Sequence, residues 1–341
     1  MQRPVMNPTF GDDASPEPTR AQRPLSMAAW RLATTVWRVL LSRPWASRRR
    51  VATEAPSAEG ALAGRVVRGL VYRMIFLPFF IAGVAGLLVY AGTHPPAVAI
   101  MRDPISVGIY YDAVTFITRD ECRLDGWLVP VLDAKKVLQQ QHRVFGAKYP
   151  AVVLVHDHAN SREQMLPLVR PLHEAGYVVL VTALRGDGAA ANRGRTFGLN
   201  ESLDVAAAVE MLGRRPFVDP TRIGVIGVGT GATAARLAAD GDPNVRSLIA
   251  LRPPGGVDEL LVRHIVPERL PWLAPLCRWT FEIAYGVNTS AAQAGRSTEG
   301  NPSRLVLHQV GTMDDSSLTE KILDHQFKHL MTKQAGVATV N

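Results

Sequence analysis

The sequence predicts an α/β domain, with a mostly parallel sheet flanked by helices, preceded by one transmembrane helix. Residues 74–92 form an apolar run without a charged side chain. As a helix, this run would span roughly 28 Å, about the thickness of a bilayer core. From residue 109 onward, strand-like apolar segments alternate with helical segments, as they do in parallel sheets covered by helices. The chain is 47% hydrophobic and 20% charged, which excludes a mainly disordered protein.

The basic charge is concentrated in the amino-terminal tail, residues 1–73. Residues 1–74 hold 12 Arg, no Lys and 5 acidic residues, a local charge of +7 out of +8 for the chain. The isoelectric point of about 9.8 therefore describes the tail, and no nucleic-acid partner is expected. The pattern of residues 26–45 predicts a helix. Its Trp and Arg residues suit a helix that lies on a membrane surface, but it could equally be an ordinary packing or partner helix.

The flanks of the apolar run predict its orientation. Arg65, Arg68 and Arg73 precede it, whereas Arg102 is the only Arg or Lys between its end and residue 119. Such an excess places the amino terminus in the cytoplasm and the carboxy-terminal domain outside it. The tail is too long for a cleaved signal peptide. We therefore expect a single-pass membrane protein whose residues 74–92 contact membrane lipids, followed by a linker over 93–108.

The outer domain, residues 109–341, begins with two short strands within residues 111–131. The predicted buried strands that follow are 149–160, 177–184, 221–228, 247–253, 304–311 and a last one at about 336–340. The predicted helices are about 161–175, 201–213, 232–240 and 317–333. Residues 270–286 predict an apolar, aromatic helix that either covers the mouth of a pocket or belongs to the core.

Five motifs in this domain resemble the α/β-hydrolases, in particular esterases of the dienelactone hydrolase and serine aminopeptidase groups. They are DGWLVP (125–130), VLVHDH (153–158), LRGDG (184–188), DPTRIGVIG (219–227) and VGTMDD (310–315). The resemblance implies a serine on a G-x-S-x-G turn, activated by a histidine that a carboxylate orients. It also implies two backbone amides that stabilise an oxyanion, and a small ester or acyl ligand.

The expected catalytic groups are only partly present. Residues 227–231 read Gly-Val-Gly-Thr-Gly, so Gly229 stands where the serine nucleophile would be. Thr230 is a poor replacement, because its side chain should point away from the nucleophile's direction. The acid position fits Asp314, with Asp315 as a second candidate, and both suit the capping of the next helix. The histidine that should follow the last strand is missing, because the sequence ends at Asn341.

The amides of Asp157, His158 and Thr230 are expected to form the oxyanion hole. The absence of a serine at Gly229 and of the histidine after the last strand favours a degenerate hydrolase that acts as a non-catalytic binding module. An esterase with an unusual nucleophile, or one whose sequence is incomplete, stays open, so whether the protein is an enzyme is left undecided. A third alternative is dinucleotide binding, because residues 227–232 fit G-x-G-x-x-A. His325 and His329 form an i, i+4 pair without an obvious third ligand, so neither a metal nor a cofactor is expected.

Overall fold

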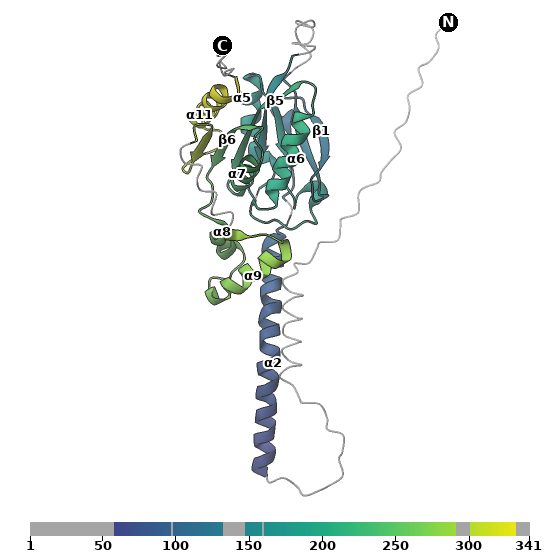
Figure 1. The fold of residues 1–341 in the computed structure, drawn as a ribbon, viewed down its shortest axis with the longest axis vertical. Coiled ribbons are helices and arrows are strands. Elements are labelled where there is room, and N and C mark those ends of the chain that lie inside the picture. The colour runs from purple at the N-terminus through teal and green to yellow at the C-terminus, as the bar shows by residue number, and fades with distance from the viewer. Residues whose placement is uncertain (1–57, 97, 132–146, 159, 291–300, 332–341) are drawn as a thin grey trace, which may run out of the picture. The chain divides into compact units, whose positions relative to one another are not determined.

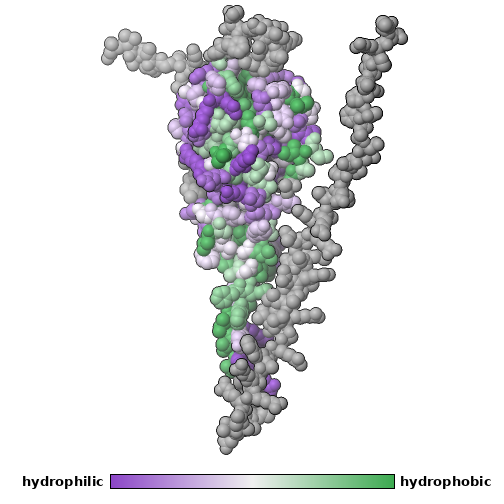
Figure 2. Space-filling model, turned by 90° about the vertical axis from the view of Figure 1, so that its right-hand side faces the viewer, coloured by the Kyte–Doolittle hydropathy of each residue, from purple (hydrophilic) through white to green (hydrophobic). Residues whose placement is uncertain are grey.

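The computed structural model describes residues 58–96, 98–131, 147–158, 160–290 and 301–331. The chain divides into two compact units, Met1–Gly69 and Leu70–Asn341. Helix α2 (Ala58–Thr93) begins in the first unit and ends in the second. Its residues Arg65–Thr93 are long and apolar enough to cross a membrane, and Figure 2 shows hydrophobic residues along it. The helix begins well before residue 74, so the end of the predicted basic tail, residues 1–73, is helical, and the predicted helix 26–45 lies outside the described residues.

The second unit contains a seven-stranded sheet in the order β1-β2-β4-β3-β5-β6-β7 (Figure 1). Its strands are β1 (Asp112–Ile117), β2 (Arg123–Val129), β3 (Tyr149–Val155), β4 (Val178–Thr182), β5 (Val218–Val228), β6 (Val245–Leu251) and β7 (Arg304–Leu307). Strand β2 runs antiparallel to both β1 and β4, and the remaining neighbours are parallel. The predicted mostly parallel sheet is confirmed. The carboxyl ends of its parallel strands lie at one edge of the sheet, which is where binding sites form in such sheets.

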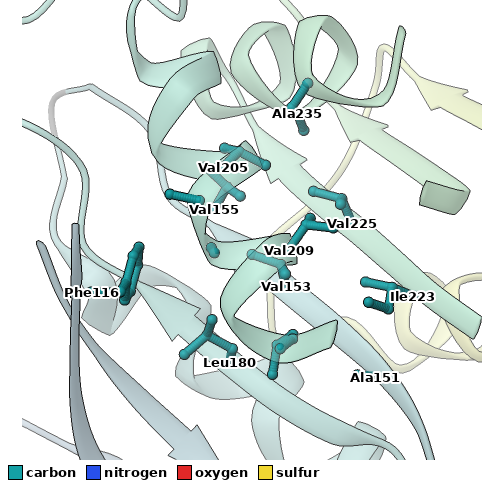
Figure 3. Packing of buried hydrophobic residues seen from close by; sticks show 14 of the residues in the cluster. Phe116, Ala151, Val153, Val155, Leu180, Val205, Val209, Ile223, Val225 and Ala235 are labelled. Carbon is teal, nitrogen blue, oxygen red and sulfur yellow. The ribbon is translucent and has the colours of Figure 1, made fainter. Parts of the chain in front are cut away.

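Helices cover both faces of this sheet. On one face, α6 (Glu201–Gly213) and α7 (Thr230–Gly241) pack on alternate side chains of the central strands. Figure 3 shows Val205 and Val209 of α6 above Val153, Val155 and Val225 of the sheet. On the other face lie α5 (Leu166–Glu174), α11 (Ser316–Gln326) and the π-helical η5 (Phe327–Met331). Because both faces are covered, the central strands read as continuous apolar runs.

Several predicted elements are divided or shortened. The predicted helix 161–175 consists of the 3-10 helix η2 (Arg162–Met165) followed by α5, and the predicted helix 317–333 changes to π geometry at Phe327. The predicted strand 304–311 ends at Leu307. The short 3-10 helices η1 (Pro104–Val107) and η3 (Gly188–Ala190) were not predicted. The last predicted strand, 336–340, lies outside the described residues.

Between β6 and β7 the chain forms α8 (Val257–His264), η4 (Pro271–Leu273) and α9 (Ala274–Tyr285). These elements share a buried apolar cluster with Ala85 and Val89 of α2, and the cluster also contains Phe197 and Phe281. The last residue of α2, Thr93, contacts the Tyr285 hydroxyl through its Oγ1 at 2.6 Å. Its carbonyl accepts a hydrogen bond from the Arg195 amide at 2.8 Å. The carboxyl end of α2 is therefore fastened to this part of the domain.

Candidate active site

The turn between β5 and α7 has the backbone of a nucleophile elbow. The strand ends at Val228, the helix begins at Thr230, and Gly229 alone makes the turn. Gly229 has φ 57° and ψ −122°, in a region where L-residues are strained. Its amide donates to the Leu251 carbonyl at 2.9 Å, which ties the turn to the end of β6. The strained geometry is thus present at the position where the family places its serine.

Two neighbouring glycines allow strand and helix to meet closely at this turn. A Cβ on Gly231 would lie 2.3 Å from the His156 carbonyl oxygen and 2.8 Å from that of Val155. A Cβ on Gly227 would lie 2.4 Å from the Gly231 carbonyl oxygen. All three obstacles are backbone atoms, which cannot move aside as a side-chain end can. Both flanking glycines are therefore required for packing, whatever chemistry the turn performs.

The carboxylate of Asp157 occupies the space in front of Gly229. A Cβ on Gly229 would lie 2.3 Å from Asp157 Oδ1 and 2.6 Å from Oδ2. The same Oδ1 accepts hydrogen bonds from the Thr230 amide at 2.9 Å, the Thr230 hydroxyl at 3.0 Å and the His158 amide at 2.8 Å. Three donors hold one carboxylate oxygen, at the amino-terminal end of α7 where negative charge is favoured. This carboxylate therefore lies where a nucleophile would have to stand.

The three amides that are expected to form the oxyanion hole do not all donate to the same acceptor. Those of His158 and Thr230 both donate to Asp157 Oδ1, and the His158 amide also donates to the Thr230 hydroxyl at 2.8 Å. The amide of Asp157 does not join them, because it donates to Gln164 Oε1 at 2.8 Å. The Asp157 amide therefore points to a different acceptor from the other two, and its role as an oxyanion donor stays a prediction. Sequence reasoning also missed that the Asp157 side chain, rather than its backbone, enters this space, since no sequence pattern determines a side-chain rotamer.

His158 lies beside this carboxylate in an aromatic cluster. Its ring centroid is 4.7 Å from that of Phe197 and 5.8 Å from that of His264. Burial, with a smaller contribution from the neighbouring Arg195, lowers the pKa of His158 to about 4, although the carboxylates of Asp157 and Asp187 act in the opposite direction. His158 is therefore neutral at pH 7.

A second group of side chains braces the loop after β3. The Arg195 guanidinium donates to the His158 carbonyl and to Asp187 Oδ1, the latter at 2.6 Å. Asp187 Oδ2 in turn lies 3.1 Å from Nε2 of the buried His156, whose Nδ1 is 2.9 Å from the Asp157 carbonyl oxygen. The carboxylate that holds a histidine here is therefore Asp187. This arrangement supports the loop and leaves His156 fully buried.

The turn that contains Asp187 is itself anchored by a buried ion pair. Arg185 Nη2 lies 2.7 Å from Asp204 Oδ1 on α6, and Nη1 lies 2.9 Å from Asp120 Oδ2. These partners raise the pKa of Arg185 further above its usual value, although burial acts in the opposite direction. The LRGDG motif thus serves to fix the loop after β4.

The acid position lies apart from these groups. Asp314 follows β7 and is exposed, and it lines an open depression of about 760 Å³ between α5 and α11 that contains no residue of the elbow. Asp315 caps α11, because its carboxylate accepts from the Ser317 amide at 2.9 Å, and this bond lowers its pKa. His325 and His329 contact each other, with ring centroids 4.5 Å apart, on the helix that follows. The described part of the chain contains no cluster of three or more metal-ligating side chains.

Comparison with protein families matches residues 137–259 to the "Dienelactone hydrolase family". This part of the chain, about a third of its length, is thus similar to the dienelactone hydrolase family, as its motifs predict. Two uncharacterized proteins of Mycobacterium tuberculosis are each 33% identical to it over 118 residues. That match covers 35% of this chain and 37% of each relative, so the chain matches well under half of their length.

Several solved structures share parts of this arrangement. The Pyrococcus furiosus esterase Pf2001 is 21% identical, with a TM-score of 0.48, over 69% of this chain and 99% of that one. The alpha/beta hydrolase GrgF from a Penicillium species is 17% identical, with a TM-score of 0.46, over 66% of this chain and all of the other. The dipeptidyl peptidase 4 of Porphyromonas gingivalis is 18% identical, with a TM-score of 0.43, over 65% of this chain and 36% of that enzyme.

Proposed function

We propose that this protein is a membrane-anchored, non-catalytic member of the α/β-hydrolases. Helix α2 anchors it, with the basic tail in the cytoplasm and the hydrolase-fold domain outside. The observation that carries the proposal is the Asp157 carboxylate, which accepts both converging amides and fills the space in front of Gly229. Hydrolysis through an acyl intermediate needs these amides free for the substrate's developing negative charge. A carboxylate already bound there repels that charge, and glycine supplies no nucleophile.

One observation favours a second candidate, a hydrolase in which Asp157 itself is the unusual nucleophile. Its carboxylate reaches the place that a serine oxygen would otherwise take, and Oδ1 is held by three donors. Such a carboxylate would attack a saturated carbon, displace its leaving group with the bonding electron pair and form an ester, which water would then cleave at the carboxyl carbon of Asp157. Single turnover in ¹⁸O-labelled water would leave the label in Asp157 under this mechanism.

The same contact argues against dinucleotide binding at residues 227–232. A pyrophosphate would need the amides at the amino-terminal end of α7, and the Thr230 amide already serves Asp157. The phosphates would also face that carboxylate. We expect titration with NADPH to produce no fluorescence change and no thermal shift.

The proposed function is tested by treating the full-length protein, in detergent, with a fluorophosphonate probe and a panel of short-chain esters. We expect no probe adduct on any peptide and no turnover above that of the Asp157→Ala variant. Turnover that Asp157→Ala abolishes, together with ¹⁸O in Asp157, would establish the second candidate. A probe adduct on another residue, lost on denaturation, would overturn both.

A further inference from the structure

We propose that the α8–α9 segment is a membrane-docking surface that lies in the lipid interface beside α2. The surface consists of Leu270, Trp272, Trp279 and Ile283, which we call the cap surface. The proposal rests on the proposed anchoring by α2. It adds that the carboxyl-end edge of the sheet, with the Asp157 loop beneath it, faces the bilayer.

The cap surface forms one stripe of helical spacing. Trp272, Trp279 and Ile283 are 59%, 60% and 62% exposed, and the half-buried Leu276 completes the spacing 272, 276, 279, 283. The opposite side of α9 is fully used, since Cys277 and Phe281 are buried in the cluster shared with α2. An amphipathic helix turns one face to its own core and the other to a partner. Here both faces are apolar, so the outer one has an apolar partner.

The attachment to α2 places this stripe at membrane depth. Ala85 and Val89, which pack against α8 and α9, lie 8 and 4 residues before Thr93, roughly 12 and 6 Å from the end of the helix. A bilayer core takes about 20 helical residues, and counting from Met74, after the last arginine of α2, the twentieth residue is Thr93. Ala85 and Val89 would then lie in the outer hydrocarbon.

The cap surface also meets lipid if the membrane-spanning part of α2 begins earlier in the sequence. If the span began at Arg65, where the helix segment long and apolar enough to cross a membrane starts, about 20 residues would end just before Ala85. The residues that hold α8 and α9 would then be at headgroup level. In either register α9 meets lipid. The side chains agree, because Trp is the residue type enriched at membrane interfaces, and Tyr90 of α2 is also exposed there.

Behind the cap surface, tilted ring contacts lead from the buried side of α9 to the candidate site. Phe281 of α9 lies 6.0 Å from Phe197, and Phe197 lies 4.7 Å from His158, between ring centroids. His158 adjoins Asp157. Docking of the cap surface therefore places the membrane about three side chains from the Asp157 carboxylate, so an acyl chain in the outer leaflet is the ligand class that this edge of the sheet meets first.

The test uses full-length protein reconstituted in phosphatidylcholine vesicles whose acyl chains carry bromine, a short-range quencher of tryptophan. The tail residues Trp30, Trp37 and Trp45 are changed to Phe. In that background, the W127F variant keeps only the cap tryptophans, and the W272F/W279F variant keeps only Trp127, which is buried in the sheet domain. We expect brominated lipid to remove most of the fluorescence of the first variant, and bromine near the headgroups to act most strongly. We expect it to leave the second variant unchanged.

Flotation of the same samples with the vesicles separates the two levels of the proposal. Protein that fails to float would refute the anchoring by α2. Protein that floats, with cap tryptophans that are not quenched, would overturn the docking surface and leave the anchoring intact. If chemical cross-linking instead joins two copies of the chain through the cap surface, and lipid does not quench the cap tryptophans, the docking surface is likewise overturned. Unchanged circular dichroism and melting temperature show that the variants are folded.

Discussion

The turn after β5 and the turn after β7 should both carry catalytic groups in an α/β-hydrolase, yet they differ sharply here. At the first, the strained Gly229 and the close-packed Gly227 and Gly231 keep the full backbone geometry of the elbow. At the second, Asp314 is exposed, and Asp315 caps a helix. The comparison teaches that close packing at Gly227 and Gly231 is enough to hold the backbone of the elbow around Gly229, whereas the acid position is exposed and lies apart from it.

The largest effect should come from the packing glycine of the first turn. We expect Gly231→Ala to lower the free energy of unfolding by about 3 kcal/mol or more, because the new Cβ meets two backbone carbonyls. Gly241→Ala, at the other end of α7, is the matched control, since its Cβ would meet nothing within 4 Å. Chemical denaturation of both variants measures the difference. Equal stabilities would mean that the close approach of α7 to β3 is absent.

The free energy of unfolding should depend on pH through His158, which lies in the loop beside the elbow. The pKa of His158 is about 4 in the folded protein and about 6.5 when unfolded. The unfolded state therefore binds the proton more tightly, so this contribution to stability is complete above pH 6.5 and is lost as the pH falls toward 4. At pH 4.5 the loss is about 2.5 kcal/mol. His158→Gln should remove this component of the pH dependence, and identical profiles for variant and wild type would contradict it.

The next effect tests whether Asp157 and Gly229 share one space. We expect Gly229→Ala to cost about 2 kcal/mol, from backbone strain and displacement of the carboxylate. In the Asp157→Ala background the same change should cost about 1 kcal/mol less, because only the strain is left. A double-mutant cycle measured by denaturation gives this coupling. Strictly additive changes would show that the carboxylate lies elsewhere.

The smallest effect concerns the second turn. Asp315→Ala should lower the melting temperature by roughly 2 °C, because it removes the cap of α11. Asp314→Ala should leave the melting temperature unchanged, and neither variant should alter ester turnover. If Asp314→Ala reduced a measurable turnover, the acid position would be functional and the contrast between the two turns would fail.

The sheet and the elbow could be predicted from the sequence because they depend on local patterns. Buried parallel strands read as apolar runs, and the glycines of residues 227–231 mark a tight strand-to-helix turn. The position of the Asp157 carboxylate could not, because it depends on the rotamer of one side chain and on donors from Thr230, 73 residues away. The brace from Arg195 was missed for the same reason: its partners His158 and Thr93 are distant in sequence.

The central claim is that Asp157 occupies the anion site that a substrate would need. Removing the carboxylate while keeping its donors tests this most directly. The Asp157→Ala variant should free the Thr230 amide and leave the His158 amide bonded only to the Thr230 hydroxyl, so acetate or butyrate should raise its melting temperature in a saturable way. The wild-type protein, titrated identically, should show no such shift. Equal stabilisation of both proteins, or of neither, would contradict the account.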